Sequence, residues 1–231
     1  TSITIPEGVI SLGEFVFYGC TKLQKVTIPR RVITIGYRSF LNTGIYNKAS
    51  NWENGVLYID NCLIAIKETF KGALTVKEGT RIIGGNASHY TNSSQRATIT
   101  ALTLPTSLTH IGESGFAGTA ITSLTIPESV IYIGDYSLAN TKLTSLIIPN
   151  SVTYIGIKAF MNSTSLSSIT IPNSVTYIGG QAFYGCSSLT SISLPESVTS
   201  IEDETFRECK NLTSINIPNS IKSIGKFAFC D

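Results

Sequence analysis

Leu166-Ser-Ser-Ile-Thr-Ile-Pro172-Asn-Ser-Val-Thr-Tyr-Ile-Gly179-Gly-Gln-Ala-Phe183-Tyr-Gly-Cys186 is the stretch that most other segments of the chain resemble. Its pattern is L-x-x-I-x-I-P-x-x-V-x-x-I-G-x-x-x-F-x-x-C. The prolines keep its register, and all eight occupy the same position: Pro6, Pro29, Pro105, Pro127, Pro149, Pro172, Pro195 and Pro218. From Pro105 onward the spacing of the prolines is nearly constant, and the first two intervals are one position shorter than the others. We call each copy of the pattern a rung.

Each rung is expected to contribute two walls to one shared core. Leu166, Ile169 and Ile171 alternate with polar residues, as in a half-buried strand. A proline then ends the strand, because it has no N–H to donate to a neighbour. Val175 and Ile178 point inward as the second wall. We expect Gly179 to form a corner with unusual backbone angles, and Phe183 to fill the return turn.

A fixed period in the twenties with this apolar pattern is the signature of a leucine-rich repeat solenoid. One rung cannot bury its own apolar side, whereas stacked rungs share a continuous core. The sequence therefore predicts a mainly β fold of about nine rungs of about 22–23 residues, with parallel strands stacked about 4.8 Å apart.

Four segments are expected within one continuous solenoid. Residues 1–43 and 99–231 are regular repeats. Residues 44–72 are an irregular insert, in which two apolar runs flank Asp60-Asn61 and predict a β-hairpin that takes the place of a rung. Residues 73–98 are a degenerate repeat, with Lys77 at the proline position, followed by a polar loop near residues 89–96.

The array resembles the BspA-type leucine-rich repeat family of bacterial surface proteins. The resemblance covers nearly the whole chain and rests on motifs such as Leu189-Thr-Ser-Ile-Ser-Leu-Pro195. It implies a secreted or cell-surface protein with a role in adhesion to host or bacterial surfaces. Because Thr1 begins in mid-strand, we expect a piece of a longer protein, with signal and anchor outside it.

Composition excludes several classes of partner. The net charge is +2, and charged residues are only 14% of the chain. This argues against nucleic acid, which requires a basic stripe. No apolar run approaches the length of about 18 residues that a membrane span needs.

The candidate binding residues lie just before the Ile-Gly pairs, at positions expected to face solvent: His110, Tyr132, Tyr154 and Tyr177. Stacked rungs would align them in a stripe that binds a protein or glycan. The alternative, which we favour, is an aromatic ladder that only stabilises its own face. On the strand face, Ile147 interrupts columns of Ser and Thr and is a further candidate contact.

The five cysteines offer no metal site, because C-x-x-C and paired histidines are absent from the sequence. Cys20, Cys186 and Cys209 share one repeat position, and we expect free, buried thiols there. Cys186 and Cys209 lie on neighbouring rungs, so the alternative is a disulfide between them.

No catalytic motif is found in the sequence, and we expect neither enzyme activity nor a cofactor. The acidic cluster Glu202-Asp203-Glu204 is interpreted as a solvated turn rather than a calcium site. Two functions remain. The first is an extracellular adhesion module that binds through an extended solenoid face, and the second is a structural spacer without a ligand.

Overall fold

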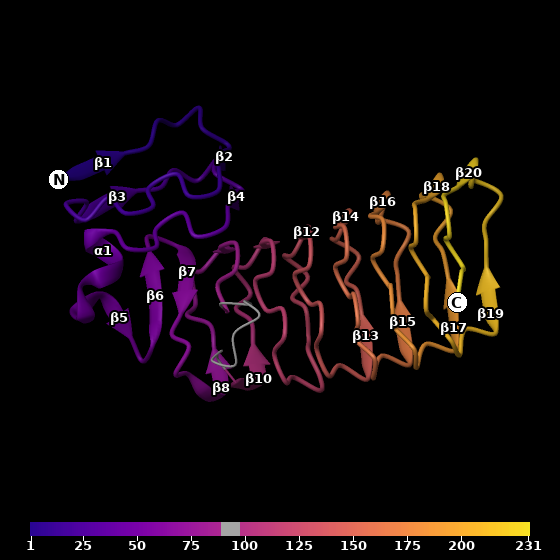
Figure 1. Ribbon diagram of the computed structural model, residues 1–231. Helices are drawn as coiled ribbons and strands as arrows, with labels where there is room; N and C mark the ends of the chain where they lie inside the picture. Colours follow the sequence, from indigo (N-terminus) through magenta and orange to yellow (C-terminus); the bar gives the residue numbers. More distant parts are fainter. Residues whose placement is uncertain (89–97) are drawn as a thin grey trace.

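The computed structural model describes residues 1–88 and 98–231, and its fold is a β-solenoid of about nine turns (Figure 1). The predicted solenoid is confirmed. The polar loop predicted near residues 89–96 lies outside the described residues. Most rungs contribute one strand to each of two faces, which lie on opposite sides of the array (Figure 1).

The short-strand face carries strands of two residues: β2 (Ser11–Leu12), β4 (Thr34–Ile35), β9 (Ile82–Ile83), β11 (His110–Ile111), β12 (Tyr132–Ile133), β14 (Tyr154–Ile155), β16 (Tyr177–Ile178), β18 (Ser200–Ile201) and β20 (Ser223–Ile224). The long-strand face carries strands of three to six residues: β1 (Ser2–Thr4), β3 (Lys25–Thr27), β8 (Lys71–Thr75), β10 (Thr98–Thr103), β13 (Ser145–Ile147), β15 (Ser168–Thr170), β17 (Ser191–Ser193) and β19 (Ser214–Asn216). Outside the insert these strands pair in parallel, and partners are one rung apart, as in Ser145↔Ser168.

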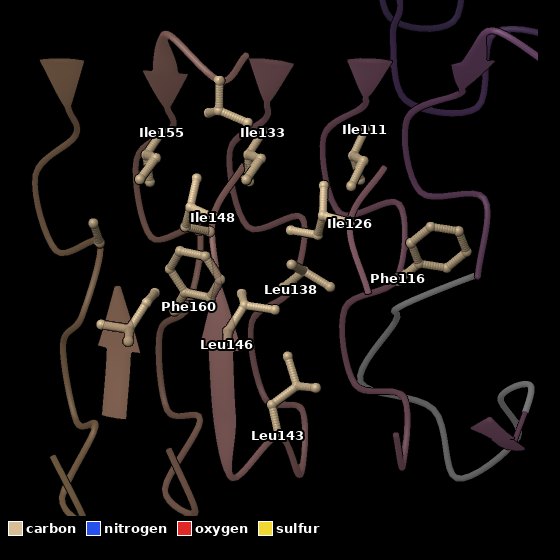
Figure 2. Packing of buried hydrophobic residues seen from close by; sticks show 14 of the residues in the cluster. Ile111, Phe116, Ile126, Ile133, Leu138, Leu143, Leu146, Ile148, Ile155 and Phe160 are labelled. Atoms are coloured by element: carbon tan, nitrogen blue, oxygen red, sulfur yellow. The ribbon is translucent and has the colours of Figure 1, made fainter. Parts of the chain in front are cut away.

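The core lies between the two faces. Leu166, Ile169 and Ile171 are buried from one side, and Val175 and Ile178 from the other, as predicted. The same positions of successive rungs lie next to one another, as Figure 2 shows for Ile111, Ile133 and Ile155. Every rung thus completes the apolar surface of its neighbours.

The aromatic position of the last four rungs forms a stack at the return turn, which is buried except at Phe229, its last member. The rings of Phe160, Phe183, Phe206 and Phe229 are stacked with centroid distances of 5.4, 5.5 and 5.5 Å. Phe160 and Phe183 are fully buried. The aromatic residues therefore fill the turn, as the sequence predicts, and align neighbouring rungs.

The corner at Gly179 lacks the unusual backbone angles that the sequence predicts for it. Gly179 has no left-handed backbone; instead, a Cβ atom there would collide with the amide nitrogen of Ile157 on the preceding rung. The glycine is needed because two backbones approach closely. The left-handed φ occurs two positions later, at Gln181, with φ of 59°. The same position is left-handed in other rungs: Phe15, Arg38, Asn86, Ser114, Tyr136, Lys158, Glu204 and Phe227.

The loop that leads into the long strand has two lengths. In the longer rungs it closes locally, for example through a 3.0 Å hydrogen bond from the amide of Leu189 to the carbonyl of Cys186. The two rungs between Pro105 and Pro149 are shorter, because a single position is missing between the aromatic residue and the strand. There the amides of Ala120 and Lys142 donate instead to the previous rung, at Ile99 and Ile121.

The irregular insert begins with α1 (Gly44–Asn47) and a 3-10 turn, η1 (Ala49–Asn51). It continues with three antiparallel strands: β5 (Trp52–Glu53), β6 (Val56–Ile59) and β7 (Cys62–Ile66). Asp60 has the left-handed φ of 47° that such a tight turn requires, as predicted. Because β7 pairs in parallel with β9, it occupies the place of a rung in the ladder.

The hairpin separates two cores, which explains why every residue of β7 is buried. Leu63 and Ile66 join the core of the later rungs, whereas Cys62 and Ile64 join that of residues 1–43. A strand buried on both faces has a continuous apolar sequence. Strands β1 and β3 run across the direction of the later long strands (Figure 1).

Polar contacts close the junction between these two parts. The carboxylate of Asp60 accepts a 2.6 Å hydrogen bond from the amide of Ile28, at the position where regular rungs bond to the next carbonyl. The guanidinium of Arg81 donates to the carbonyls of Pro29, at 2.7 Å, and Val32.

Candidate functional site

The short strands align four aromatic side chains in one row, here called the aromatic row: His110, Tyr132, Tyr154 and Tyr177. Their backbone register is direct, since His110 pairs with Tyr132, Tyr132 with Tyr154, and Tyr154 with Tyr177. The Tyr132 and Tyr154 rings are stacked, with centroids 4.7 Å apart and planes inclined by 7°. Tyr154 and Tyr177 are stacked at 5.0 Å and 17°.

The three tyrosines are half-buried, but His110 is only 6% exposed, so the prediction that His110 faces solvent is wrong. Its imidazole lies 5.7 Å from the Tyr132 ring, and its Nδ1 is 2.8 Å from the hydroxyl of Thr109. Burial, with the nearby positive charge of Arg81, lowers the pKa of His110 to about 4. The ring is therefore neutral at physiological pH and extends the row inward.

The negative charge of nearby carboxylates acts on the tyrosine hydroxyls. Burial raises the pKa of Tyr132 and Tyr154, and the negative charge of Asp135 raises both further. The pKa of Tyr177 is raised by burial and then by Glu202 and Asp135. The phenols therefore keep their protons, and the tyrosine part of the row carries neutral hydroxyl groups in a negative electrostatic environment.

This arrangement limits what the row can contact. Each Tyr154 face is covered by a neighbouring ring, so stacking of a ligand on the middle of the row is blocked. The exposed parts are ring edges and hydroxyls, which can donate and accept hydrogen bonds. With Asp135 and Glu202 beside them, they favour a partner that carries cationic groups.

Two of the carboxylates at this site, Glu113 and Asp135, are not among the residues predicted from the sequence. Glu113 and Asp135 follow the corner glycines of successive rungs, on the same face as the tyrosines. The pKa of Glu113 is raised by burial and by the charges of Glu14 and Asp135, so these acidic groups act on one another. Their shared position after the glycine is the signal that could have revealed them.

The long-strand face contains a groove of about 720 Å³. It is lined by three consecutive rungs: Leu102, Thr103, Leu104, Thr106, Ser123, Leu124, Thr125, Ile126, Pro127, Glu128, Ser145, Leu146, Ile147 and Pro149. Ile147 is 74% exposed at this groove, so the sequence prediction of an outward apolar side chain at this position is confirmed.

All five cysteines are free. The three that share one repeat position differ in exposure, because Cys186 and Cys209 are buried and Cys20 is exposed. Cys186 and Cys209 are buried and donate to the carbonyls of Phe160 and Phe183, at 3.2 and 3.1 Å. Burial raises the pKa of Cys186, and that of Cys209 to about 12, which keeps both as unreactive thiols. Cys20 is exposed, so the prediction of a buried thiol is wrong there, in the outermost rung of this chain.

The acidic cluster is divided among separate contacts. Glu202 accepts a hydrogen bond from Ser200, Asp203 accepts one from the amide of Lys226, and Glu204 pairs with Arg207. Across residues 1–88 and 98–231, no three His, Cys, Asp or Glu side chains gather in a way that could hold a metal ion. In the same residues, no helix is long and apolar enough to cross a membrane.

Comparison with known proteins identifies the repeat. Six copies of the BspA type leucine rich repeat region match the chain, over residues 1–97, 90–187 and 131–231. No curated protein matches.

Three solved structures are similar. A leucine rich repeat protein of T. pallidum is 23% identical, with a TM-score of 0.63 over 78% of this chain and 85% of that chain. A leucine-rich repeat protein of Bacteroides ovatus is 24% identical over 100% of this chain and 76% of its own, with a TM-score of 0.35. A leucine rich cell surface protein of Faecalibacterium prausnitzii is 23% identical over 94% of this chain and 78% of its own, with a TM-score of 0.30. The first of these similarities supports the fold.

Proposed function

Because the chain belongs to the BspA-type leucine-rich repeat family, we propose that it is a cell-surface interaction module, whose aromatic row binds a protein partner with a basic surface. The observation that carries the proposal is the row itself. Four rungs place His110, Tyr132, Tyr154 and Tyr177 in direct register, and the negative charge of Asp135 acts on all three tyrosines.

Rigidity favours this function. Tyrosine supplies contact area at low cost in side-chain entropy. The stacked rings and the paired short strands already hold these side chains in place, so little order remains to be imposed when a partner binds. The acidic groups would attract a basic surface and position it along the row.

The second candidate is a spacer that separates other domains and has no ligand. The continuous core and the buried Phe stack favour it, because they make the array stiff without requiring a partner. Ring faces that contact one another also stabilise the short-strand face by themselves.

Binding of the purified chain to immobilised surfaces tests the proposal. Interferometry would compare host matrix proteins, mucin glycans and whole bacteria as targets. The key variant replaces Tyr132, Tyr154 and Tyr177 by Ser, the residue that later rungs carry at this position in Ser200 and Ser223. The control is Tyr18→Ser, because Tyr18 is 49% exposed and lies outside the row.

We expect binding to a protein target that weakens with added salt, is lost in the triple variant and is kept in the control. The triple variant must retain the β-sheet circular dichroism of the original chain. Binding that survives in the triple variant, or binding only to glycans, contradicts the proposal. No binding to any target favours the spacer.

A further inference from the structure

The groove on the long-strand face is bordered by backbone that has lost its usual partners. The backbone of Ser123–Ile126 is not part of any strand, although the equivalent segments form β10 before it and β13 after it. Within the described part of the chain, none of these four residues donates or accepts a backbone hydrogen bond. In several other rungs the residue before the proline position does so, as when the amide of Ile148 donates to Thr170 at 3.0 Å and that of Leu194 donates to Asn216 at 3.1 Å.

The segment nevertheless has a fixed place in the fold. Ile121 and Ile126 are buried, and Figure 2 shows Ile126 beside the other core residues of its neighbours. Leu124 is only half-buried, whereas its equivalent Leu146 is 3% exposed. The groove therefore presents unpaired main-chain groups together with a partly uncovered core side chain.

We propose that this groove binds an extended peptide segment of a partner protein, in which an apolar side chain lies next to a basic one. This inference rests on the proposed interaction function and adds a second contact site on the opposite face. Amide and carbonyl groups without partners are what an added strand recognises. The volume of about 720 Å³ is within the range of sites that hold ligands.

The side chains define the segment further. Ile147 and Leu124 offer an apolar contact, and Thr103, Thr125 and Ser145 offer hydroxyl groups. Among the described lining residues Glu128 alone is charged, and the Thr106 hydroxyl donates to the carboxylate of Glu78 at 3.3 Å. These two carboxylates favour a Lys or Arg in the peptide. Because the same lining residues include no aromatic ring on which a sugar could stack, a peptide fits better than a glycan.

The test is the selection of peptides from a phage-displayed library of random linear dodecapeptides on the purified chain. Ile147→Thr serves as counter-selection, since Thr170 shows that the repeat accepts threonine at this position. Enriched sequences would be synthesised, and their affinities measured by fluorescence anisotropy. Scrambled peptides of the same composition control for non-specific charge effects.

We expect enriched peptides with an apolar residue beside Lys or Arg. Their affinity should fall about tenfold with Ile147→Thr, because the apolar contact that the bound peptide makes with Ile147 is lost. It should fall severalfold with Glu128→Gln. It should be unchanged with Ile157→Thr, a matched control, since Ile157 is 41% exposed and lies outside the groove. Hydrogen exchange of the Leu124, Thr125 and Ile126 amides should slow when the peptide binds.

The inference is overturned if no peptide is enriched, if enriched peptides bind the Ile147→Thr variant equally well, or if the amides of residues 124–126 are unaffected. Its failure is distinct from failure of the proposed function. Loss of surface binding in the triple tyrosine variant concerns the aromatic row, whereas the groove variants leave the row intact.

Discussion

From β7 to β16 the short-strand face forms one unbroken parallel ladder, whereas the long-strand face consists of separate pairs, β8 with β10, β13 with β15 and β17 with β19. The same rungs contribute to both faces, so the difference arises within each rung. Ser123–Ile126 lies between β10 and β13 and follows a loop that is shorter by a single position than in the later rungs. A shared core fixes the rungs, whereas pairing on the long-strand face varies from rung to rung. The strand β13 follows an equally short loop and pairs with β15, and β15 does not pair with β17.

The stability of the short-strand face should be the more sensitive to added side-chain volume. We expect Gly179→Ala to lower the free energy of unfolding by about 3 kcal/mol, because the new methyl group would meet the backbone of Gly156 and Ile157. Urea unfolding followed by circular dichroism measures this. Gly13→Ala is the control: it has the same repeat position but no atom within 4 Å of the added carbon. Equal losses in the two variants would contradict the close-approach explanation.

Low pH should lower the stability of the short-strand face through protonation of His110. Its pKa is about 4 in the folded chain, against an ordinary value of 6.5, so the unfolded chain binds a proton that the folded chain does not. Stability from this residue is present above pH 6.5 and is lost as pH falls toward 4, by about 3 kcal/mol in full. Unfolding at pH 7 and pH 4.5 would measure the loss, and His110→Gln should reduce it. An identical pH dependence in the variant would show that other groups are responsible.

Lengthening one loop should make the two faces alike. Insertion of Ser between Thr119 and Ala120 gives Pro105 and Pro127 the same spacing that Pro149 and Pro172 have. We expect Ser123–Ile126 to pair with β10 and β13, with a gain of about 1 kcal/mol. Hydrogen exchange of the Leu124 to Ile126 amides should slow at least severalfold, while the exchange of β15 amides stays the same. Unchanged exchange would mean that loop length is not what interrupts the ladder.

The smallest effect is expected at the groove itself. Ile147 is 74% exposed, so Ile147→Thr should change the free energy of unfolding by no more than about 0.5 kcal/mol. The measurement is the same urea titration, with Leu146→Thr as the buried counterpart that should lose several times more. A large loss at Ile147 would indicate that its side chain supports the fold.

The repeat made most of the fold predictable, because one pattern repeated along the chain specifies strands, corners and core together. The Pro and Phe positions placed the strand ends and the buried aromatic stack correctly. The pattern could not indicate which corner residue has a positive φ, since Gln181 is an ordinary residue whose conformation is imposed by its neighbours. Nor could it place His110, whose environment includes Arg81, a residue of the degenerate rung.

For the candidate sites, the sequence predicted the alignment of the tyrosines but not what lies beside them. The carboxylates of Glu113 and Asp135 share one repeat position, directly after the corner glycine, but the residue type at this position changes from rung to rung, so the repeat pattern alone did not select them. The groove was implicit in the two short proline spacings between Pro105 and Pro149, yet its consequence appears only when backbone hydrogen bonds are followed from rung to rung.

The nearest-neighbour packing of the rungs also bears on how such a chain can change during evolution. Apart from the insert, each rung meets its neighbours through the same set of apolar positions, and strand partners are about 23 residues apart. Unequal crossing-over that deletes or duplicates a whole rung would leave every remaining interface matched. The gene could therefore lengthen or shorten its product in steps of one repeat, which alters the reach of the protein without a new folding problem.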